Sequence, residues 1–300
     1  MKDPNRRSFL KAAAATAGIL PMTSKMTYAE TTPLFRISLA QWTLVKELKA
    51  GKIDNLDFAK IAADHQIEGL EYVNQFFMDK ANDASYLAEM KKRADDHGVK
   101  SLIIMCDREG QIGDPDPKKR AQTVDNHKKW LDAAKTLGCH SIRVNAGSSG
   151  NWEEQVKLAA DGLSSLTAVG AGMGLNVIVE NHGGLSSNGE WLSEVIKLVS
   201  HNRCGTLPDF GNFKVSDTES YDSYRGIKEL MPYAKGVSVK DTVWDDDLKQ
   251  SPLDYEKMLR IVLNSGFRGF CGIEHGGFEG LNASRSKLEQ AREKLLPEFK

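Results

Sequence analysis

The chain has 300 residues, of which 40% are hydrophobic and 27% are charged. These proportions are those of an ordinary globular domain, so the composition excludes an intrinsically disordered chain. The formal net charge is −1 at pH 7. This near neutrality excludes the basic surface excess with which proteins bind nucleic acid irrespective of sequence, and we expect no nucleic-acid partner.

The first 29 residues resemble a twin-arginine export signal. Arg6-Arg7-Ser8-Phe9-Leu10-Lys11 precedes a run of small and apolar residues from Ala12 to Met22, and Thr27-Tyr28-Ala29 offers small residues for cleavage. The alternative is a basic tail on a core helix. The resemblance implies that the twin-arginine translocation machinery is a partner during export and that the mature protein is periplasmic or otherwise exported. No stretch approaches the roughly 18 apolar residues of a membrane span, so we expect no stable anchor.

Residues 34–300 alternate eight short apolar segments with eight amphipathic stretches, and no linker divides them. This pattern predicts a single α/β domain, a closed (β/α)₈ TIM barrel, with an open doubly wound sheet as the alternative. Strands are predicted at 35–44, 69–74, 100–107, 141–147, 176–183, 205–212, 236–241 and 270–276. Helices are predicted at 56–65, 84–97, 118–137, 153–173, 190–202, 221–234, 253–265 and 285–299.

Local signals mark the ends of several predicted helices. Ser187 and Glu190 have the spacing of a capping box, and Ser251-Pro252 places a cap residue before a first-turn proline. Four glycines follow predicted helices, where a left-handed residue is expected to end each one. They are Gly98, Gly138, Gly174 and Gly266.

Three acids stand near the ends of the fifth, sixth and eighth predicted strands: Glu180, Asp209 and Glu274. The active site of a barrel forms at the carboxyl ends of its strands, so these side chains are expected to converge. Two ionised carboxylates about 4 Å apart repel by roughly 4 kcal/mol at an effective dielectric of about 20. The cluster must therefore hold a cation or take up protons, and either outcome marks a functional site.

Other polar and aromatic residues lie near the same strand ends. The period of two places Glu180 with His182, Arg143 with Asn145, and Ser238 with Lys240 on common faces of their strands. Each of these side chains also has a purely structural alternative, as a core residue, an ion-pair partner or loop packing. The candidate substrate contacts are His182, Lys240, Arg143, Asn145, Trp42 and Glu71, and the indoles of Trp152 and Trp244 are further candidates for stacking on a ligand.

These residues resemble the xylose isomerase-like TIM barrels, which include sugar isomerases, ketose 3-epimerases, inosose dehydratases and an AP endonuclease branch. The resemblance implies a divalent metal held by Glu, Asp, His and Glu at the ends of strands five to eight. Glu180, Asp209 and Glu274 match three of these positions. The fourth differs, because the family's His-x-Lys-Asp is here Ser238-Val239-Lys240-Asp241.

The missing histidine leaves the fourth ligand open. Water, His182 or Asp241 would complete the set, or metal binding is weaker than in the family. The all-oxygen donors favour Mn²⁺ or Mg²⁺ over Zn²⁺.

The resemblance implies a metal-dependent isomerase or epimerase acting on a sugar or keto-sugar, with Glu180 and Glu274 as acid/base partners as well as ligands. A lyase, dehydratase or hydrolase acting on oxidised (3-keto) glycosides is one alternative, and a non-catalytic carbohydrate-binding barrel is another. The nuclease branch is disfavoured because its histidine ligands and basic face are missing. A small carbohydrate is thus the expected ligand, and a homo-oligomer remains open.

The four cysteines stand singly in or beside predicted strands and lack metal-type spacing, which predicts buried thiols. An oxidising compartment would permit a disulfide between them. They are Cys106, Cys139, Cys204 and Cys271.

Overall fold

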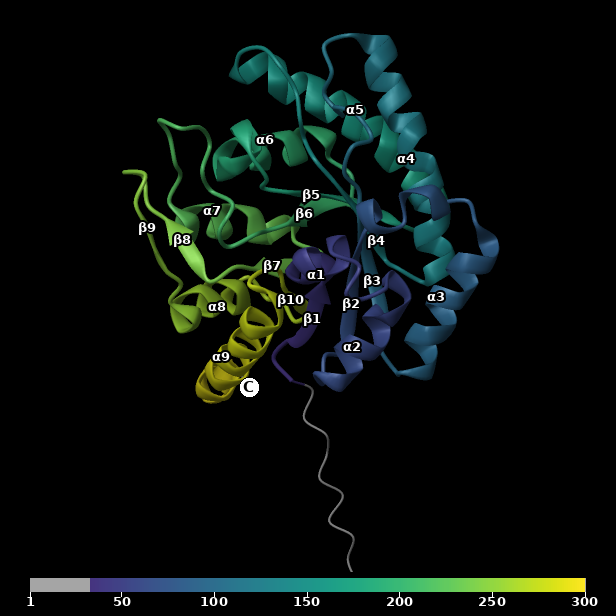
Figure 1. Cartoon of the computed structure of the whole chain (residues 1–300). Coiled ribbons are helices and arrows are strands. Elements are labelled where there is room, and N and C mark those ends of the chain that lie inside the picture. Colours follow the sequence, from purple (N-terminus) through teal and green to yellow (C-terminus); the bar gives the residue numbers. More distant parts are fainter. Residues whose placement is uncertain (1–32, 300) are drawn as a thin grey trace, which may run out of the picture. The chain divides into compact units, whose positions relative to one another are not determined.

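A computed structural model describes residues 33–299, which form a barrel of parallel strands surrounded by helices (Figure 1). The predicted export signal lies outside these residues. One eight-stranded sheet runs in the order β6-β5-β4-β3-β2-β1-β10-β7, and isolated parallel bridges from Thr206 to Ala234 and from Asp209 to Ser238 join its two edges. The TIM barrel prediction is confirmed, and the open sheet is excluded. The strands are β1 (Arg36–Ala40), β2 (Gly69–Val73), β3 (Lys100–Met105), β4 (Ser141–Val144), β5 (Asn176–Glu180), β6 (Cys204–Leu207), β7 (Val237–Val239) and β10 (Phe270–Ile273).

The helices begin and end at residues with recognisable capping chemistry. Asp116 accepts a hydrogen bond from the Lys118 N–H at the start of α4, and Asn151 and Glu154 form a capping box at the start of α5. All four predicted glycines have a positive φ, between 67° and 84°. The helices are α1 (Val45–Lys49), α2 (Phe58–Asp64), α3 (Ala84–Asp96), α4 (Pro117–Leu137), α5 (Trp152–Gly172), α6 (Gly189–Val199), α7 (Ser223–Leu230), α8 (Tyr255–Asn264) and α9 (Gly277–Phe299).

Two predicted caps were wrong. The cap of α6 is Asn188, not Ser187, and its carboxamide oxygen accepts the N–H groups of Glu190 and Trp191. The cap of α8 is Asp254, whose carboxylate accepts the Lys257 N–H. A Ser-Pro pair suits an extended edge as well as a helix start, which is why 251–252 misled the prediction.

The segment expected to lead into α8 instead forms an antiparallel hairpin, β8 (Thr242–Trp244) with β9 (Gln250–Pro252), at the side of the barrel (Figure 1). The first strand is also shorter than predicted, because residues 41–44 turn into a 3₁₀ helix, η1 (Gln41–Leu44). The last helix is longer than predicted and starts at Gly277. These changes all occur next to strand ends, where the polar loops of a barrel are built.

The barrel interior divides into an apolar part and a polar part. Side chains of β3, β5 and β6 fill one part, including Ile103, Met105, Ile178 and Leu207. Register places Ser38, Gly272 and Ser238 in one row across β1, β10 and β7, and the bridge from Ser238 continues that row to Asp209. This row therefore ends at Asp209, one of the three predicted acids.

The four cysteines are free and buried, as predicted. Within the part of the chain that the structure describes, no helix is both long and apolar enough to cross a lipid bilayer.

Candidate active site

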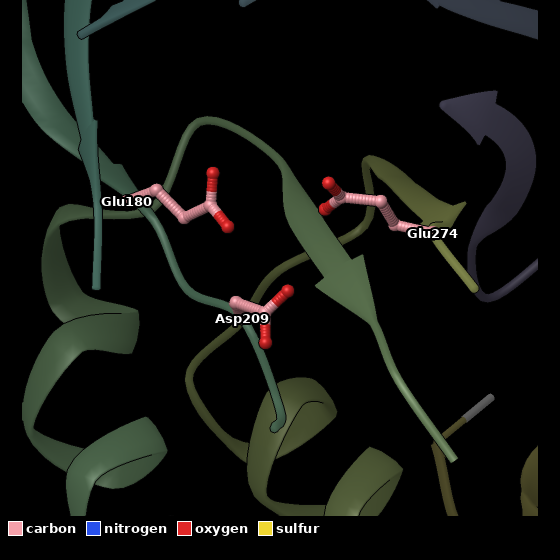
Figure 2. Close-up of side chains that lie close together, drawn as sticks. All are labelled: Glu180, Asp209 and Glu274. Atoms are coloured by element: carbon pink, nitrogen blue, oxygen red, sulfur yellow. The ribbon is translucent and has the colours of Figure 1, made fainter. Parts of the chain in front are cut away.

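The three predicted acids converge at the carboxyl ends of β5, β6 and β10. One carboxylate oxygen from each lies within 4.8 Å of the others (Figure 2). Figure 2 shows Glu180 and Glu274 reaching toward each other from opposite sides, with Asp209 between and below them. Glu180 and Asp209 are fully buried, and Glu274 is 5% exposed. Glu180 and Glu274 are 94 positions apart in the sequence, and the parallel pairing of the strands brings them together.

Backbone groups hold Asp209 in place. Its Oδ1 accepts hydrogen bonds from the N–H groups of Gly211 and Asn212, at 2.8 Å and 2.9 Å. The Asn181 carboxamide accepts the Asp209 N–H at 2.7 Å and donates to the Asp209 carbonyl at 2.9 Å. The turn after β6 therefore fixes one face of the carboxylate and leaves Oδ2 directed at the other acids.

Glu180 is held by one amide and one guanidinium. Asn212 Nδ2 donates to its Oε1 at 2.9 Å, and Arg143 Nε lies 2.8 Å from its Oε2. The Arg143 contact is poorly aligned, so Oε2 is an ion-pair partner that accepts no hydrogen bond. Arg143 also pairs with Asp107, at 2.9 Å. Burial raises the pKa of Glu180 to about 8 despite the Arg143 charge.

Lys240 and Ser238 connect the other two acids. Lys240 Nζ lies 3.1 Å from Glu274 Oε2 and 3.4 Å from Asp209 Oδ2, and it donates to the Glu274 carbonyl at 2.9 Å. Ser238 Oγ lies 2.6 Å and 2.8 Å from the same two carboxylate oxygens. A hydroxyl has one proton, so it donates to one of them at a time.

The pKa values of the two glutamates are pushed apart. Burial would raise the pKa of Glu274, but the charges of Lys240 and Arg143 lower it below its usual value. Burial would likewise lower the pKa of Lys240, but Asp209 and Glu274 raise it. A protonated Glu180 facing an ionised Glu274 is an arrangement that supports acid and base chemistry at one site.

The group fits a divalent cation. Four linked carboxylates, Glu180, Asp209, Glu274 and Asp107, face two cations, Arg143 and Lys240. The formal charge is −1 with Glu180 protonated and becomes −2 when Glu180 ionises to bind an ion. The unbonded Glu180 Oε2 offers a buried lone pair. Glu180, Asp209 and Glu274 are the residues that would hold the ion. Among the described residues, that set includes neither His182 nor Asp241, the two expected replacement donors.

Two cavities lie beside the acids and share one lining residue, Lys240. Cavity A, of about 460 Å³, is lined by residues after β5, β6 and β7, among them His182, Asn212 and Trp244. Cavity B, of about 590 Å³, is lined by residues after β1 and β10, among them Trp42 and Glu274.

The structure therefore brings several of the predicted substrate contacts to the cavities and places others elsewhere. His182, Lys240 and Trp42 line them. Arg143 and Asn145 hydrogen-bond each other and Asp107, which places both in the network behind Glu180.

Glu71 and Trp152 lie away from both cavities. Glu71 was expected at the end of a strand, but it is the middle residue of β2, fully buried, where it accepts a hydrogen bond from Ser38 at 2.6 Å. Trp152 donates to Glu194 on the helical surface.

Sequence reasoning missed three polar residues that hold the acids, namely Asp107, Asn181 and Asn212. Two of them stood close to a predicted acid: Asn181 follows Glu180, and Asn212 comes three residues after Asp209. Asp and Asn near a turn tend to bond local backbone groups, which was the available signal. Asp107 had no local signal, because its partner Arg143 comes from the next strand.

The sequence matches the family described as xylose isomerase-like TIM barrel over residues 59–296, most of the chain. The chain belongs to this family. A search of curated proteins gives no match. Solved structures of similar fold include the following three, each of which matches at least 86% of this chain.

A D-tagatose 3-epimerase-like protein is 16% identical, with a TM-score of 0.69, and the match covers 89% of this chain and 100% of that one. The IOLI protein with a bound zinc atom is 14% identical, with a TM-score of 0.67 and coverage of 89% and 99%. The 3-keto-D-glucoside 4-epimerase YcjR from E. coli is 15% identical, with a TM-score of 0.65 and coverage of 86% and 99%. At these identities the likeness shows the fold alone.

Proposed function

We propose that this xylose isomerase-like barrel is a sugar isomerase or epimerase that uses a divalent metal and two glutamates to move a proton next to a carbonyl. The observation that carries the proposal is the convergence of Glu180, Asp209 and Glu274 at the carboxyl ends of the strands. The epimerase names of two similar structures and the zinc of a third support the same chemistry.

The position of each residue in the site suggests its role in the reaction. Glu180, Asp209 and Glu274 would hold the metal, which when bound polarises a sugar oxygen and acidifies the neighbouring C–H. The carboxylates of Glu180 and Glu274 approach from opposite sides (Figure 2). One removes the proton from the carbon next to the carbonyl, and the other returns a proton to the adjacent carbon or to the opposite face. Lys240 Nζ would donate to the substrate oxygen on which negative charge develops.

Mn²⁺ or Mg²⁺ is the metal we propose, since the donors are all oxygen. Removal of the same proton with loss of a neighbouring substituent would make the protein a lyase. This second candidate is favoured by Lys240, whose ammonium stands beside Glu274 and can protonate a leaving oxygen.

Hydrogen exchange tests the proposal directly. The protein without its first 29 residues, supplied with Mn²⁺ in D₂O, should incorporate deuterium next to the carbonyl of at least one sugar or 3-keto-glycoside in a broad panel. Retention of the carbon skeleton indicates isomerisation, and loss of water or an aglycone indicates the lyase. Binding without exchange across the whole panel would contradict an enzyme and favour a carbohydrate-binding barrel.

Metal content tests the ligand set separately. Glu180→Gln should sharply lower the Mn²⁺ content measured by elemental analysis, because it replaces the carboxylate with a neutral amide. Glu190→Gln is the matched control, since Glu190 is an exposed acid on α6 that pairs with Arg225. Full metal occupancy in the Glu180 variant would remove Glu180 from the ligand set.

We also propose twin-arginine export, on the strength of Arg6-Arg7 and the apolar run after it. Replacing both arginines with lysine should keep the full-length protein in the cytoplasmic fraction of cells that export the parent chain. Unchanged export of that variant would contradict the pathway.

A further inference from the structure

The two cavities meet at a single residue that also contacts the acids. Lys240 lines both cavities, and its Nζ lies 3.1 Å from Glu274 and 3.4 Å from Asp209. Elsewhere their walls come from different parts of the barrel. Cavity A is built by the loops after β5 and β6 and by the β8–β9 hairpin, and cavity B by η1, α1 and the start of α9. The one residue that the two cavities share is therefore also the residue that pairs with Glu274 and Asp209.

Each cavity has the size and the wall chemistry of a sugar subsite. Their volumes of about 460 Å³ and 590 Å³ each fall in the range of roughly 300–1,000 Å³ that holds a small ligand. An indole contributes to each wall, Trp244 in cavity A and Trp42 in cavity B. Indoles combine a large apolar face with a polar edge, which suits the apolar face and hydroxyl rim of a sugar ring.

The cavities differ in their access to the acids. Glu274 lines cavity B and is the one acid of the three that is not completely buried. Cavity A reaches the acids through Asn212, which donates to Glu180, and through Lys240. A ring in cavity B thus lies against a reactive carboxylate, whereas a ring in cavity A lies against the residues that support the acids.

We propose that the substrate is a glycoside of two units, with the reacting sugar in cavity B against Glu274 and the second unit in cavity A against Trp244. The linkage between them then passes Lys240. This inference rests on the proposed function for its account of the reacting unit, but its binding preference does not depend on turnover. One sugar ring would fill only one of the two cavities.

Binding measurements test the two-unit substrate. Isothermal titration of the mature protein with Mn²⁺ would compare disaccharides and their 3-keto derivatives with the matched methyl glycosides. Contact with the second cavity should make the best two-unit ligand bind at least about tenfold more tightly than its one-unit counterpart. Equal affinities of one-unit and two-unit ligands for the unmodified protein would overturn the proposal.

A tryptophan variant locates the second unit. In Trp244→Ala the ratio of one-unit to two-unit Kd should fall from about tenfold to near one, and Trp244→Phe should keep part of it because an aromatic face remains. Trp152→Ala, which removes an indole outside both cavities, should leave the ratio unchanged. An unchanged ratio in Trp244→Ala would overturn the assignment of cavity A. If that variant does not fold, Trp244→Phe and the comparison of one-unit with two-unit ligands still test the assignment of cavity A.

The outcomes separate this inference from the proposed function. Preference for two-unit ligands without deuterium exchange would contradict the isomerase and leave the two-unit site standing. Exchange on monosaccharides with no preference for two units would contradict the two-unit site and leave the isomerase standing.

Discussion

The two cations of the site hold acids in different ways. Arg143 is buried, and its guanidinium bridges Glu180 and Asp107 on the β3–β5 side of the barrel. Lys240 is partly exposed and lines both cavities, and its ammonium bridges Asp209 and Glu274. Arg143 is therefore buried behind the site, whereas Lys240 lies at its surface.

This difference gives Arg143 a supporting role and Lys240 a role in the chemistry of the site. The Arg143 guanidinium holds Asp107 ionised, since its charge and neighbouring hydrogen bonds lower the pKa of that carboxyl to about 2 despite burial. It also orients Glu180, whose pKa burial nonetheless raises to about 8. An ammonium at a cavity wall can contact a ligand without unfolding the barrel. We therefore expect Arg143 variants to act mainly on stability and Lys240 variants to act on the site.

The largest expected effect is that of Arg143→Met. It leaves the buried Glu180 and the partly buried Asp107 without their cation, so the free energy of unfolding measured in urea should fall by about 3–5 kcal/mol. Arg225→Met removes an exposed ion-pair residue and should cost less than about 1 kcal/mol. A loss for Arg143→Met as small as that of the control would show that Arg143 does not support the acids.

Glu71 extends the comparison to an acid that pairs with neither cation. Burial raises its pKa from 4.5 to about 7, and its Oε2 has no hydrogen-bond partner. A carboxyl whose folded pKa is raised stabilises the fold fully below pH 4.5, and this contribution is lost as the pH rises toward 7.

Glu71→Gln should therefore leave stability nearly unchanged at about pH 4.5 and raise it by roughly 3 kcal/mol above about pH 7. Urea denaturation at both pH values measures this difference. Glu68→Gln, at an exposed acid just before β2, should change stability by less than about 0.5 kcal/mol. A gain that is the same at both pH values would show that Glu71 is not protonated in the fold.

The sequence predicted the architecture and the acids, because both follow from short-range patterns. Alternating apolar segments specify eight βα units, and Glu180, Asp209 and Glu274 each stand directly at a strand end. The four predicted glycines adopt the expected left-handed conformation for the same local reason.

What the sequence left open depends on contacts between strands. That Lys240 bridges two acids follows from the closure of β6 on β7 and β10, which no local pattern encodes. The β8–β9 hairpin was missed because its second strand contains Ser251-Pro252, which also fits a helix start. Glu71 was misplaced because a strand of five residues leaves little margin between its middle and its end.

Lys240→Met tests the surface cation. Without metal, the charges of Asp209 and Glu274 lose their partner, so the variant should be less stable by about 2 kcal/mol. Mn²⁺ at about 100 times its Kd should restore about 2.7 kcal/mol, because the ion supplies the missing charge. Mn²⁺ should also stabilise Arg143→Met by mass action, since its three ligands remain, but that variant should stay well below the Mn²⁺-loaded parent because Asp107 stays unpaired. Urea denaturation of the parent and both variants, each with EDTA or with Mn²⁺, measures this. The deficit of Lys240→Met relative to the parent should shrink with Mn²⁺, and a deficit that persists equally in both variants would erase the distinction between the cations.

The smallest expected effect comes from Gly211→Ala, whose added methyl group crowds the Lys240 side chain but leaves its ammonium in the protein. A Cβ at residue 211 would lie 2.8 Å from both Cβ and Cγ of Lys240, at the base of that side chain where it cannot swing away. The variant should lose about 1–3 kcal/mol of stability through overpacking. Gly172→Ala, at a helix position with open space around it, should be neutral or stabilising by up to about 1 kcal/mol.

A double-mutant cycle shows whether the lysine carries this effect. If Gly211→Ala acts by displacing Lys240, its cost should shrink when residue 240 is already methionine, since the ion pairs with Asp209 and Glu274 are then absent. Strict additivity of the two substitutions would instead assign the cost to contacts that methionine retains, with Cβ and Cγ of residue 240 or with the Thr242 carbonyl, 3.1 Å from the added Cβ. Gly211 would then shape the turn into β8 and have no part in positioning the cation.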